Sequence, residues 1–406
     1  MFAQQQEEIL KNKKIAVDVI WSIAALVLMN GVLQLFIYPS FNSRLGAEKM
    51  GDVLYALSIL AIFSPALGSA ANNARLVEKR EHDVKNGDIL LVMFPLSVIF
   101  AVLYVMIISG YLFDPFEYIM AGVLLVLTVF RYYGDVEYRL SLNYKGYFVY
   151  YLTISLGYIA GVLLYPVTNS WILVFLIGEV ASNVVVLISG KIYRPLTLSE
   201  NHTQISRKIL VLTLSYLLYN GVLNLDRILL QNLIDSETVT IYYVGSLLGK
   251  TAALLVGPLN SVILSYMSKN NTQITRKQYM KISAVIIGVG AVIFAVILAV
   301  MPLFVNILYK DISARVLEIS TVANLSQIIC FSSSLLLTIM LTFASAKWQL
   351  IIQASYAAVF LALGIAGAKI GGLQGFIIAI LLANIIRLVL VFGIGVIKLN
   401  SGVNNK

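Results

Sequence analysis

Three ionisable residues interrupt apolar stretches of the sequence, and their chemistry is suited to binding charged groups. Lys250, Arg387 and Glu179 each lie within a run of apolar residues, Glu179 in the stretch WILVFLIGEVASNVVVLI. A lysine or arginine holds an anion through charge-assisted hydrogen bonds, whereas a carboxylate pairs with a cation or carries a proton. A charge at the centre of a membrane costs about 2.5–3.5 kcal/mol, so each of these residues requires a partner or water.

Polar side chains accompany these charges at helical spacing. Asn384 precedes Arg387 by about one turn, and Tyr243 and Ser246 fall on the helical face that carries Lys250. The remaining candidate substrate-binding residues are polar or basic: Arg227, Asn224, Asn324, Gln327 and Arg75. Hydrogen bonding between helices would equally explain the asparagine and glutamine side chains, and control of membrane topology would explain Arg75.

Two interpretations of the charged residues stay open. Lys250 and Arg387 either line a water-filled chamber between two halves of the chain and hold a pyrophosphate group, or form structural ion pairs, for example with Glu179. Asp226 and Arg227 form either an ion pair that reaches the headgroups from a helix end, or a gating or substrate contact. Glu179 or Asp226 is the candidate for a coupling proton.

Other kinds of site lack the residues they would need. The chain has one cysteine, Cys330, so it forms no internal disulfide and no cysteine metal cluster. His82 and His202 fall in polar connections, which disfavours a histidine proton relay inside a membrane. The phosphate-binding pattern GxxxxGK[ST] is missing. We therefore expect no catalytic residue, no metal site and no cofactor.

The composition places these residues in membrane-spanning helices. Of 406 residues, 59% are hydrophobic and 12% are charged, against roughly 25% charged in an ordinary soluble domain; the mean hydropathy is +0.88. A water-soluble globule is excluded, and we expect an all-α integral membrane protein with about twelve spans. The expected spans are 15–37, 53–73, 88–110, 116–133, 147–165, 170–190, 207–231, 239–264, 281–302, 318–343, 349–368 and 374–397.

The basic residues predict the orientation. With the N-terminus inside, 21 of the 29 basic residues fall in the tails and inner connections, and five fall in outer connections. This bias predicts that both termini are cytoplasmic. Because the net charge of +9 is spread over alternate connections and forms no single patch, it does not indicate binding to nucleic acid.

Every expected outer connection is short, the longest running from about 38 to 52. There is no room for a folded external domain. A membrane glycan polymerase or ligase generally needs a large outer loop, so it is the least favoured of the functions considered.

A weak internal repeat divides the chain. Aligning Glu48 with Glu237 superimposes RLGAEKMGDVLYALSIL on LIDSETVTIYYVGSLLGK, an offset of 189 residues. We expect two six-helix bundles, residues 1–198 and 199–406. Since each bundle crosses the membrane an even number of times, a pseudo-two-fold axis along the membrane normal would relate them, with the binding site between them.

The same stretches carry a family resemblance. RLGAEKMGDVLYAL, PALGSAANNARLVEKR and DRILLQNLIDSETVTIYYVGSLL resemble motifs of bacterial polysaccharide and oligosaccharide-lipid flippases. These flippases belong to the multidrug, oligosaccharidyl-lipid and polysaccharide exporter superfamily. The sequence departs from the family pattern at Thr240, where glycine is usual, and at Ile234 and Asp235, where Leu-Gly is usual.

The resemblance implies a non-enzymatic transporter of the bacterial plasma (inner) membrane. Its substrate would be an undecaprenyl-pyrophosphate-linked repeat unit of O-antigen or capsule, moved by alternating access among membrane lipids and passed on to glycan polymerase machinery. The alternative within the superfamily is a cation-coupled multidrug exporter. That function favours a deep acidic residue in the N-terminal half, whereas the deep charges here are mostly basic.

Overall fold

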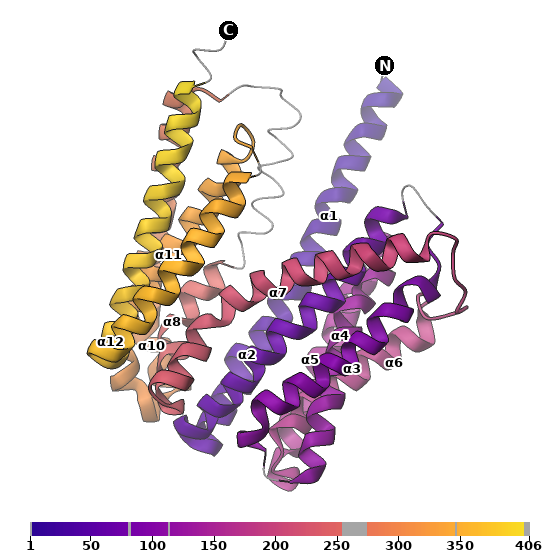
Figure 1. The fold of residues 1–406 in the computed structure, drawn as a ribbon, viewed down its shortest axis with the longest axis horizontal. Helices are drawn as coiled ribbons and strands as arrows, with labels where there is room; N and C mark the ends of the chain where they lie inside the picture. The colour runs from indigo at the N-terminus through magenta and orange to yellow at the C-terminus, as the bar shows by residue number, and fades with distance from the viewer. Residues whose placement is uncertain (1, 80–82, 113, 254–273, 346, 402–406) are drawn as a thin grey trace. The chain divides into compact units, whose positions relative to one another are not determined.

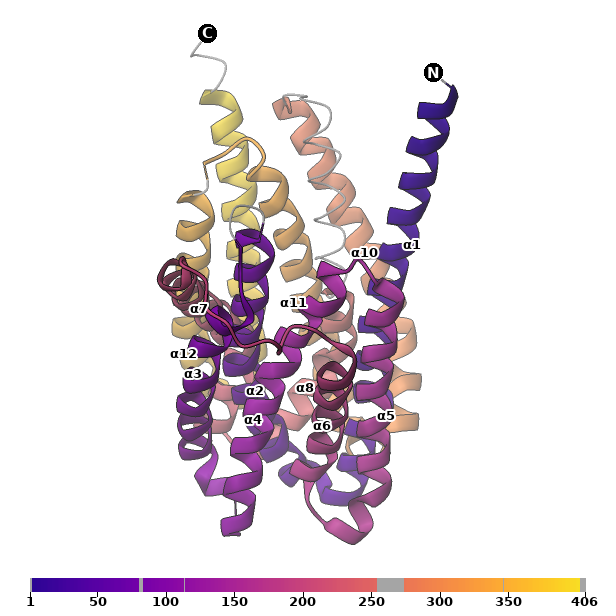
Figure 2. The same ribbon diagram turned by 90° about the vertical axis from the view of Figure 1, so that its right-hand side faces the viewer.

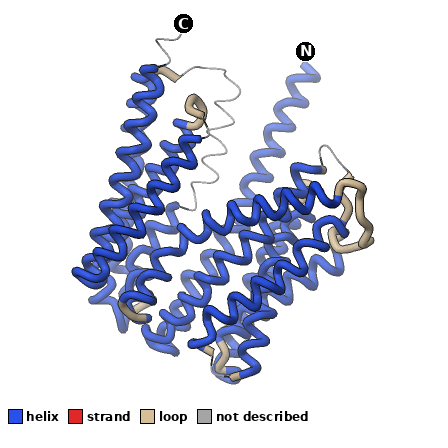
Figure 3. Tube along the Cα trace, viewed as in Figure 1, coloured by secondary structure: helices blue, strands red, loops and turns tan. Residues whose placement is uncertain are grey.

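The computed structural model describes residues 2–79, 83–112, 114–253, 274–345 and 347–401, and these are helical almost throughout (Figures 1 and 3). None of the residues in these ranges forms a strand. Nine helices in this part of the chain are long and apolar enough to cross a membrane. Many large apolar side chains are exposed on them, for example Ile119, Leu163 and Ile307, as expected for surfaces that face lipid.

The helices group into two compact units, which are described separately. Unit 1 comprises Met1–Arg44 and Tyr55–Asn224, and unit 2 comprises Leu45–Leu54 and Leu225–Lys406. The boundary between the units falls within the long helix α7 (His202–Leu233), between Asn224 and Leu225, and residues 45–54 group with unit 2. The pseudo-two-fold relation of the halves stays a prediction.

Unit 1 is built around α5 (Tyr144–Thr168), which packs against α6 (Trp171–Ser189) and α1 (Phe2–Val32) (Figure 2). Next to α6 lies α4 (Pro115–Leu140), which also packs against α3 (Asn86–Ile108). The helices α5 and α6 approach closely because glycines face each other: a Cβ on Gly157 would lie 2.5 Å from the Cα of Gly178.

Unit 2 is built around α11 (Ser313–Met340). This helix packs against α8 (Ser236–Ala253), α10 (Arg276–Leu308) and α12 (Lys347–Ser401). One apolar core lies where α10, α11 and α12 meet, around Tyr279, Phe331 and Leu336. The Tyr279 hydroxyl donates to the carbonyl of Val391 at 3.2 Å, so the polar end of this buried ring is satisfied.

Local sequence signals set the helix ends. Asp114 accepts a hydrogen bond from the Phe116 N–H at 2.9 Å and precedes Pro115, a favourable first helical residue, so α4 begins there. Asn169 ends α5 in the left-handed conformation with φ of 48°. The turns therefore lie at the ends of the apolar runs, where these residues are found.

The helices agree with the expected spans. Most predicted ends fall within a few residues of the observed ones. The helix α12 contains two expected spans, 349–368 and 374–397, and bends between them at Gly371 and Gly372. The helix α2 (Tyr38–Glu78) contains the expected span 53–73 and bends before it at Gly46, where φ is 78°. The expected span 239–264 has a helix, α8, over its first part; its last part lies outside the described residues.

The two repeated stretches found in the sequence contact each other within unit 2. The Thr240 hydroxyl donates to the carbonyl of Ala47 at 2.6 Å, and the Ser236 hydroxyl donates to Asp52 at 2.6 Å. At Gly51 the backbones nearly touch, since a Cβ there would lie 1.7 Å from the carbonyl oxygen of Ser236. Residues 45–54 are thereby joined to the start of α8, although the rest of α2 belongs to unit 1.

This close approach yields a stability prediction. Gly51→Ala should lower the free energy of unfolding by about 1–3 kcal/mol, because the new methyl group overlaps a backbone oxygen that cannot rotate away. Gly31→Ala is the matched control, since nothing lies within 4 Å of a Cβ at that position. Thermal unfolding of both variants in detergent measures the difference. Equal stability of the two variants would contradict the contact.

Candidate functional site

Lys250 lies in unit 2 and forms an ion pair with Asp226, which joins α8 to α7. The Asp226 carboxylate also accepts from the backbone N–H of Arg227 at 2.9 Å. The Asp226 side chain is 6% exposed and the Lys250 side chain 20% exposed, so the pair is largely buried but reaches the surface of the unit on its lysine side. Asp226 thus has a lysine of another helix as an ion-pair partner, and the two interpretations of Asp226 with Arg227 stay predictions.

Aromatic rings lie against the two cations of this group, Arg227 and Lys250. The Arg227 guanidinium lies 5.0 Å from the centre of the Tyr243 ring, and the Lys250 ammonium lies 5.2 Å from that of Tyr242. Gln327 of α11 donates to the Tyr242 hydroxyl at 3.4 Å. We call this set the lysine cluster: Asp226, Arg227, Tyr242, Tyr243, Lys250 and Gln327.

Arg387 of α12 is 5% exposed and is held by neutral groups of α11. Its Nη1 donates to the hydroxyls of Ser333 and Ser334 at 3.0 and 3.1 Å and lies 3.3 Å from the sulfur of Cys330. Its guanidinium carbon lies 4.8 Å from the centre of the Tyr356 ring. In the described part of the chain, the buried Nε of Arg387 has no hydrogen-bond partner.

Asn384 extends this group by one turn of α12. Its side chain accepts from the Tyr356 hydroxyl at 2.9 Å and donates to the Ser326 hydroxyl at 2.8 Å. Asn384 therefore bridges helices as well as lying beside the cation. We call this set the arginine cluster: Ser326, Cys330, Ser333, Ser334, Tyr356, Asn384 and Arg387.

The two clusters share one face of α11 and carry an excess of positive charge. Gln327 and Cys330 are three residues apart, which places them on the same side of the helix. Across both clusters there are three cations, Arg227, Lys250 and Arg387, and one carboxylate, Asp226. No carboxylate forms an ion pair with Arg387 among the described residues. The arrangement can accept an anion without adding net negative charge to unit 2.

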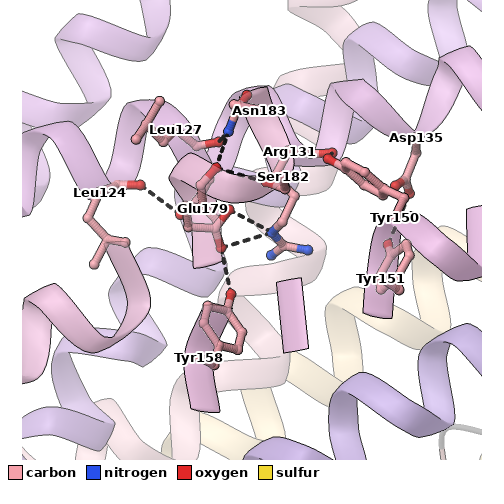
Figure 4. Close-up of polar contacts among 11 residues, drawn as sticks. Leu124, Leu127, Arg131, Asp135, Tyr150, Tyr151, Tyr158, Glu179, Ser182 and Asn183 are labelled. Carbon is pink, nitrogen blue, oxygen red and sulfur yellow. Dashed lines mark hydrogen bonds and ion pairs between the residues drawn. The ribbon is translucent and has the colours of Figure 1, made fainter. Parts of the chain in front are cut away.

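In unit 1, Glu179 of α6 pairs with Arg131 of α4 (Figure 4). The Nε of Arg131 lies 2.9 Å from both carboxylate oxygens, and the Tyr158 hydroxyl donates to the same carboxylate at 2.7 Å. The side chains of Arg131 and Glu179 are 6% and 2% exposed. This pairing takes the place of the one with Lys250 or Arg387 considered from the sequence.

A second carboxylate, Asp135, lies one turn from Arg131 on the same helix. Its Oδ2 accepts from the hydroxyls of Tyr151 at 3.2 Å and Tyr147 at 3.5 Å, and lies 3.5 Å from the guanidinium of Arg139. Neither Asp135 nor Arg131 was among the candidate site residues selected from the sequence. Arg131, Asp135 and Arg139 follow one another at intervals of four residues, so they share one face of the helix. This spacing was the sequence signal that could have identified the group.

The other candidate residues have structural partners. Arg75 is buried, donates to the Tyr133 hydroxyl, and donates to Asn86 at 2.7 Å, so it is not an open site for a lipid headgroup. Asn324 bonds the Gly245 carbonyl and the Gly249 N–H at 2.7 and 2.8 Å, which joins α11 to α8. Bridging is therefore its observed role.

Asn224 has a local hydrogen bond. It donates to the carbonyl of Asn220 at 2.9 Å within α7, and it is buried. Its amide thus satisfies the backbone of its own helix, and its role in substrate binding stays a prediction.

A cavity of about 610 Å³ lies elsewhere in unit 2, at the contact between the repeated stretches. Its lining residues are Leu45, Gly46, Ala47, Glu48, Lys49, Gln231, Asp235, Ser236 and Glu237. None of these residues belongs to the lysine or arginine cluster. The cations within the spans are therefore not part of this cavity.

The fold is similar to that of known membrane transporters. A multidrug resistance MATE family transporter of the MOP superfamily, in an inward-facing conformation, aligns with a TM-score of 0.67 and 14% identity over 95% of this chain and 99% of that chain. Lipid II flippase MurJ aligns with a TM-score of 0.63 and 16% identity over 95% and 88%. The Vibrio cholerae MATE transporter VcmN aligns with a TM-score of 0.61 and 14% identity over 96% and 97%.

These similarities extend over nearly the whole chain but at low identity, so they establish the fold. No family model and no curated protein matches the sequence. The expected all-α integral membrane architecture is confirmed.

Proposed function

We propose that this protein is a flippase for a lipid-linked oligosaccharide, and that the lysine and arginine clusters of unit 2 bind the anionic pyrophosphate of the substrate. The observation that carries the proposal is the environment of Arg387, which is buried against neutral acceptors and forms no ion pair with a carboxylate of the described residues. A buried cation without a counter-ion is costly in a membrane protein. An anionic ligand would offset that cost.

The geometry suits phosphate oxygens. Arginine and lysine side chains form charge-assisted hydrogen bonds to phosphate oxygens, and the Nε of Arg387 has a hydrogen to donate. The polar face continues through Gln327 and Asn384, whose amide groups match sugar hydroxyls. Similarity to MurJ, a lipid II flippase, supports a lipid-linked substrate, and the motifs shared with polysaccharide flippases support a glycan repeat unit at the bacterial inner membrane.

Export of cationic drugs is the second candidate, because several similar structures are MATE transporters. Such a substrate would require uncompensated negative charge. In unit 1 the buried carboxylates Glu179 and Asp135 each face a cation, Arg131 and Arg139 respectively. In unit 2 the buried Arg387 is held by neutral groups and forms no ion pair with a carboxylate of the described residues. The charge distribution therefore favours the anionic substrate.

A reconstituted transport assay discriminates between the two functions. We expect vesicles containing the protein to flip an undecaprenyl-pyrophosphate-linked oligosaccharide at least about tenfold faster than the same oligosaccharide on an uncharged polyprenyl lipid. Accessibility of a fluorescent label on the glycan to a membrane-impermeant quencher reports the rate. Equal rates for the two lipids, or pH-driven efflux of ethidium without flipping, would contradict the proposal.

A further inference from the structure

Asp135 is the buried carboxylate with the weakest hydrogen bonding in the described part of the chain. Asp88 accepts from two backbone N–H groups at 2.8 Å each. Glu179 and Asp226 are each paired with a cation and accept a further hydrogen bond, and Glu78 is paired with a lysine. The contacts of Asp135 are 3.2–3.5 Å long, they all fall on Oδ2, and its buried Oδ1 has no partner.

The groups around Asp135 can accommodate both its ionised and its protonated form. From α4 it faces Arg139, at 3.5 Å, and Arg131, whose Nε is already committed to Glu179 of α6. From α5 it faces the hydroxyls of Tyr147 and Tyr151, which donate to the ionised acid and can accept from the protonated acid. Both protonation states are therefore accommodated by the same neighbours.

The site lies near one end of unit 1, next to an exposed side chain. The Arg139 side chain is 38% exposed, whereas that of Asp135 is 5% exposed. Both lie in the last turns of α4, close to its turn into α5. The distribution of basic residues predicts that this turn is cytoplasmic. One turn before Asp135 on α4, Arg131 pairs with Glu179, as Figure 4 shows.

We propose that Asp135 is a proton-binding site, and that it takes up and releases a proton at the α4–α5 end of unit 1 during transport. Uptake forms an O–H bond on the carboxylate with a proton from water, and it removes the counter-charge of Arg139. Proton binding is a property of unit 1 alone, whereas its use in transport rests on the proposed flippase function.

Infrared difference spectroscopy of the protein in nanodiscs tests the proton site without any substrate. Between pH 5 and pH 8 we expect the band of a protonated carboxyl group to titrate in the wild type and to be lost in Asp135→Asn. The matched control is Asp114→Asn, the same substitution at the exposed start of the same helix, where asparagine also caps. A titrating band that survives Asp135→Asn with full amplitude would overturn the proposal.

A second variant covers the case in which Asp135→Asn fails to fold. Tyr151→Phe keeps the carboxylate but removes the shorter of its two tyrosine donors. Because that donor stabilises the ionised acid, the titration should move to higher pH, by about half a unit to one unit. An unchanged titration in Tyr151→Phe would count against Asp135.

Transport measurements separate the two proposals. In vesicles, the flipping rate of the wild type should depend on pH, and Asp135→Asn should abolish that dependence. If the wild type does not flip the lipid but its infrared titration depends on Asp135, the flippase proposal fails and the proton site stands. If flipping occurs with the same pH profile in Asp135→Asn, the coupling role of the site is overturned.

Discussion

Arg387→Ala is expected to lower the flipping rate by about 10- to 100-fold, because it removes charge-assisted hydrogen bonds worth about 1.5–3 kcal/mol. The substitution should leave the fold intact. Arg387 is held by hydroxyls, a sulfur atom and an aromatic ring, so its removal leaves no buried carboxylate without a partner. The loss should therefore appear in substrate binding and transport, with little change in the thermal unfolding temperature.

The control for this prediction is another arginine of unit 2. Arg315 pairs with Glu237, but its side chain is 54% exposed and it belongs to neither cluster. Arg315→Ala removes the same charge and should transport at the wild-type rate. Equal loss in both variants would mean that net charge, and not the arginine cluster, controls transport. An unchanged rate in Arg387→Ala would contradict the pyrophosphate site.

Hydropathy and turn residues were sufficient to predict the helices. Apolar runs of about twenty residues form helices in a membrane because a helix satisfies its own backbone hydrogen bonds. Asp114–Pro115 marks the start of α4, and Asn169 marks the end of α5. The bend of α2 at Gly46 falls within the expected connection 38–52. The extent of the compact units was not predictable in this way, since it depends on long-range contacts such as that between Gly51 and Ser236.

The charged residues were found from the sequence, but not all of their partners. Asp226 was selected, yet its partner Lys250 lies 24 residues away on another helix. Likewise, Glu179 is paired with Arg131, which is 48 residues away. A single sequence gives the faces of each helix but not which faces meet, because packing between helices decides that. Arg131 was therefore not identified from the sequence as the partner of Glu179.

Arg131→Met is expected to destabilise unit 1 strongly, by about 3–5 kcal/mol, because it leaves the buried Glu179 carboxylate without its cation. Both guanidinium contacts at 2.9 Å are lost, and the Tyr158 hydroxyl remains as a donor to the carboxylate. Low yield of folded protein from membranes and a reduced thermal unfolding temperature would report the effect. Arg139→Met, at a side chain that is 38% exposed, should cost less than about 1 kcal/mol.

The double variant Arg131→Met/Glu179→Gln distinguishes two causes of the stability loss, the unpaired charge of Glu179 and the lost packing of Arg131. A neutral glutamine can still accept from the Tyr158 hydroxyl, and methionine fills much of the space of the arginine stem. Removing both charges of a buried pair is often close to neutral for stability. The double variant should therefore recover most of the stability lost in Arg131→Met. If it were as unstable as the single variant, packing rather than charge would explain the loss.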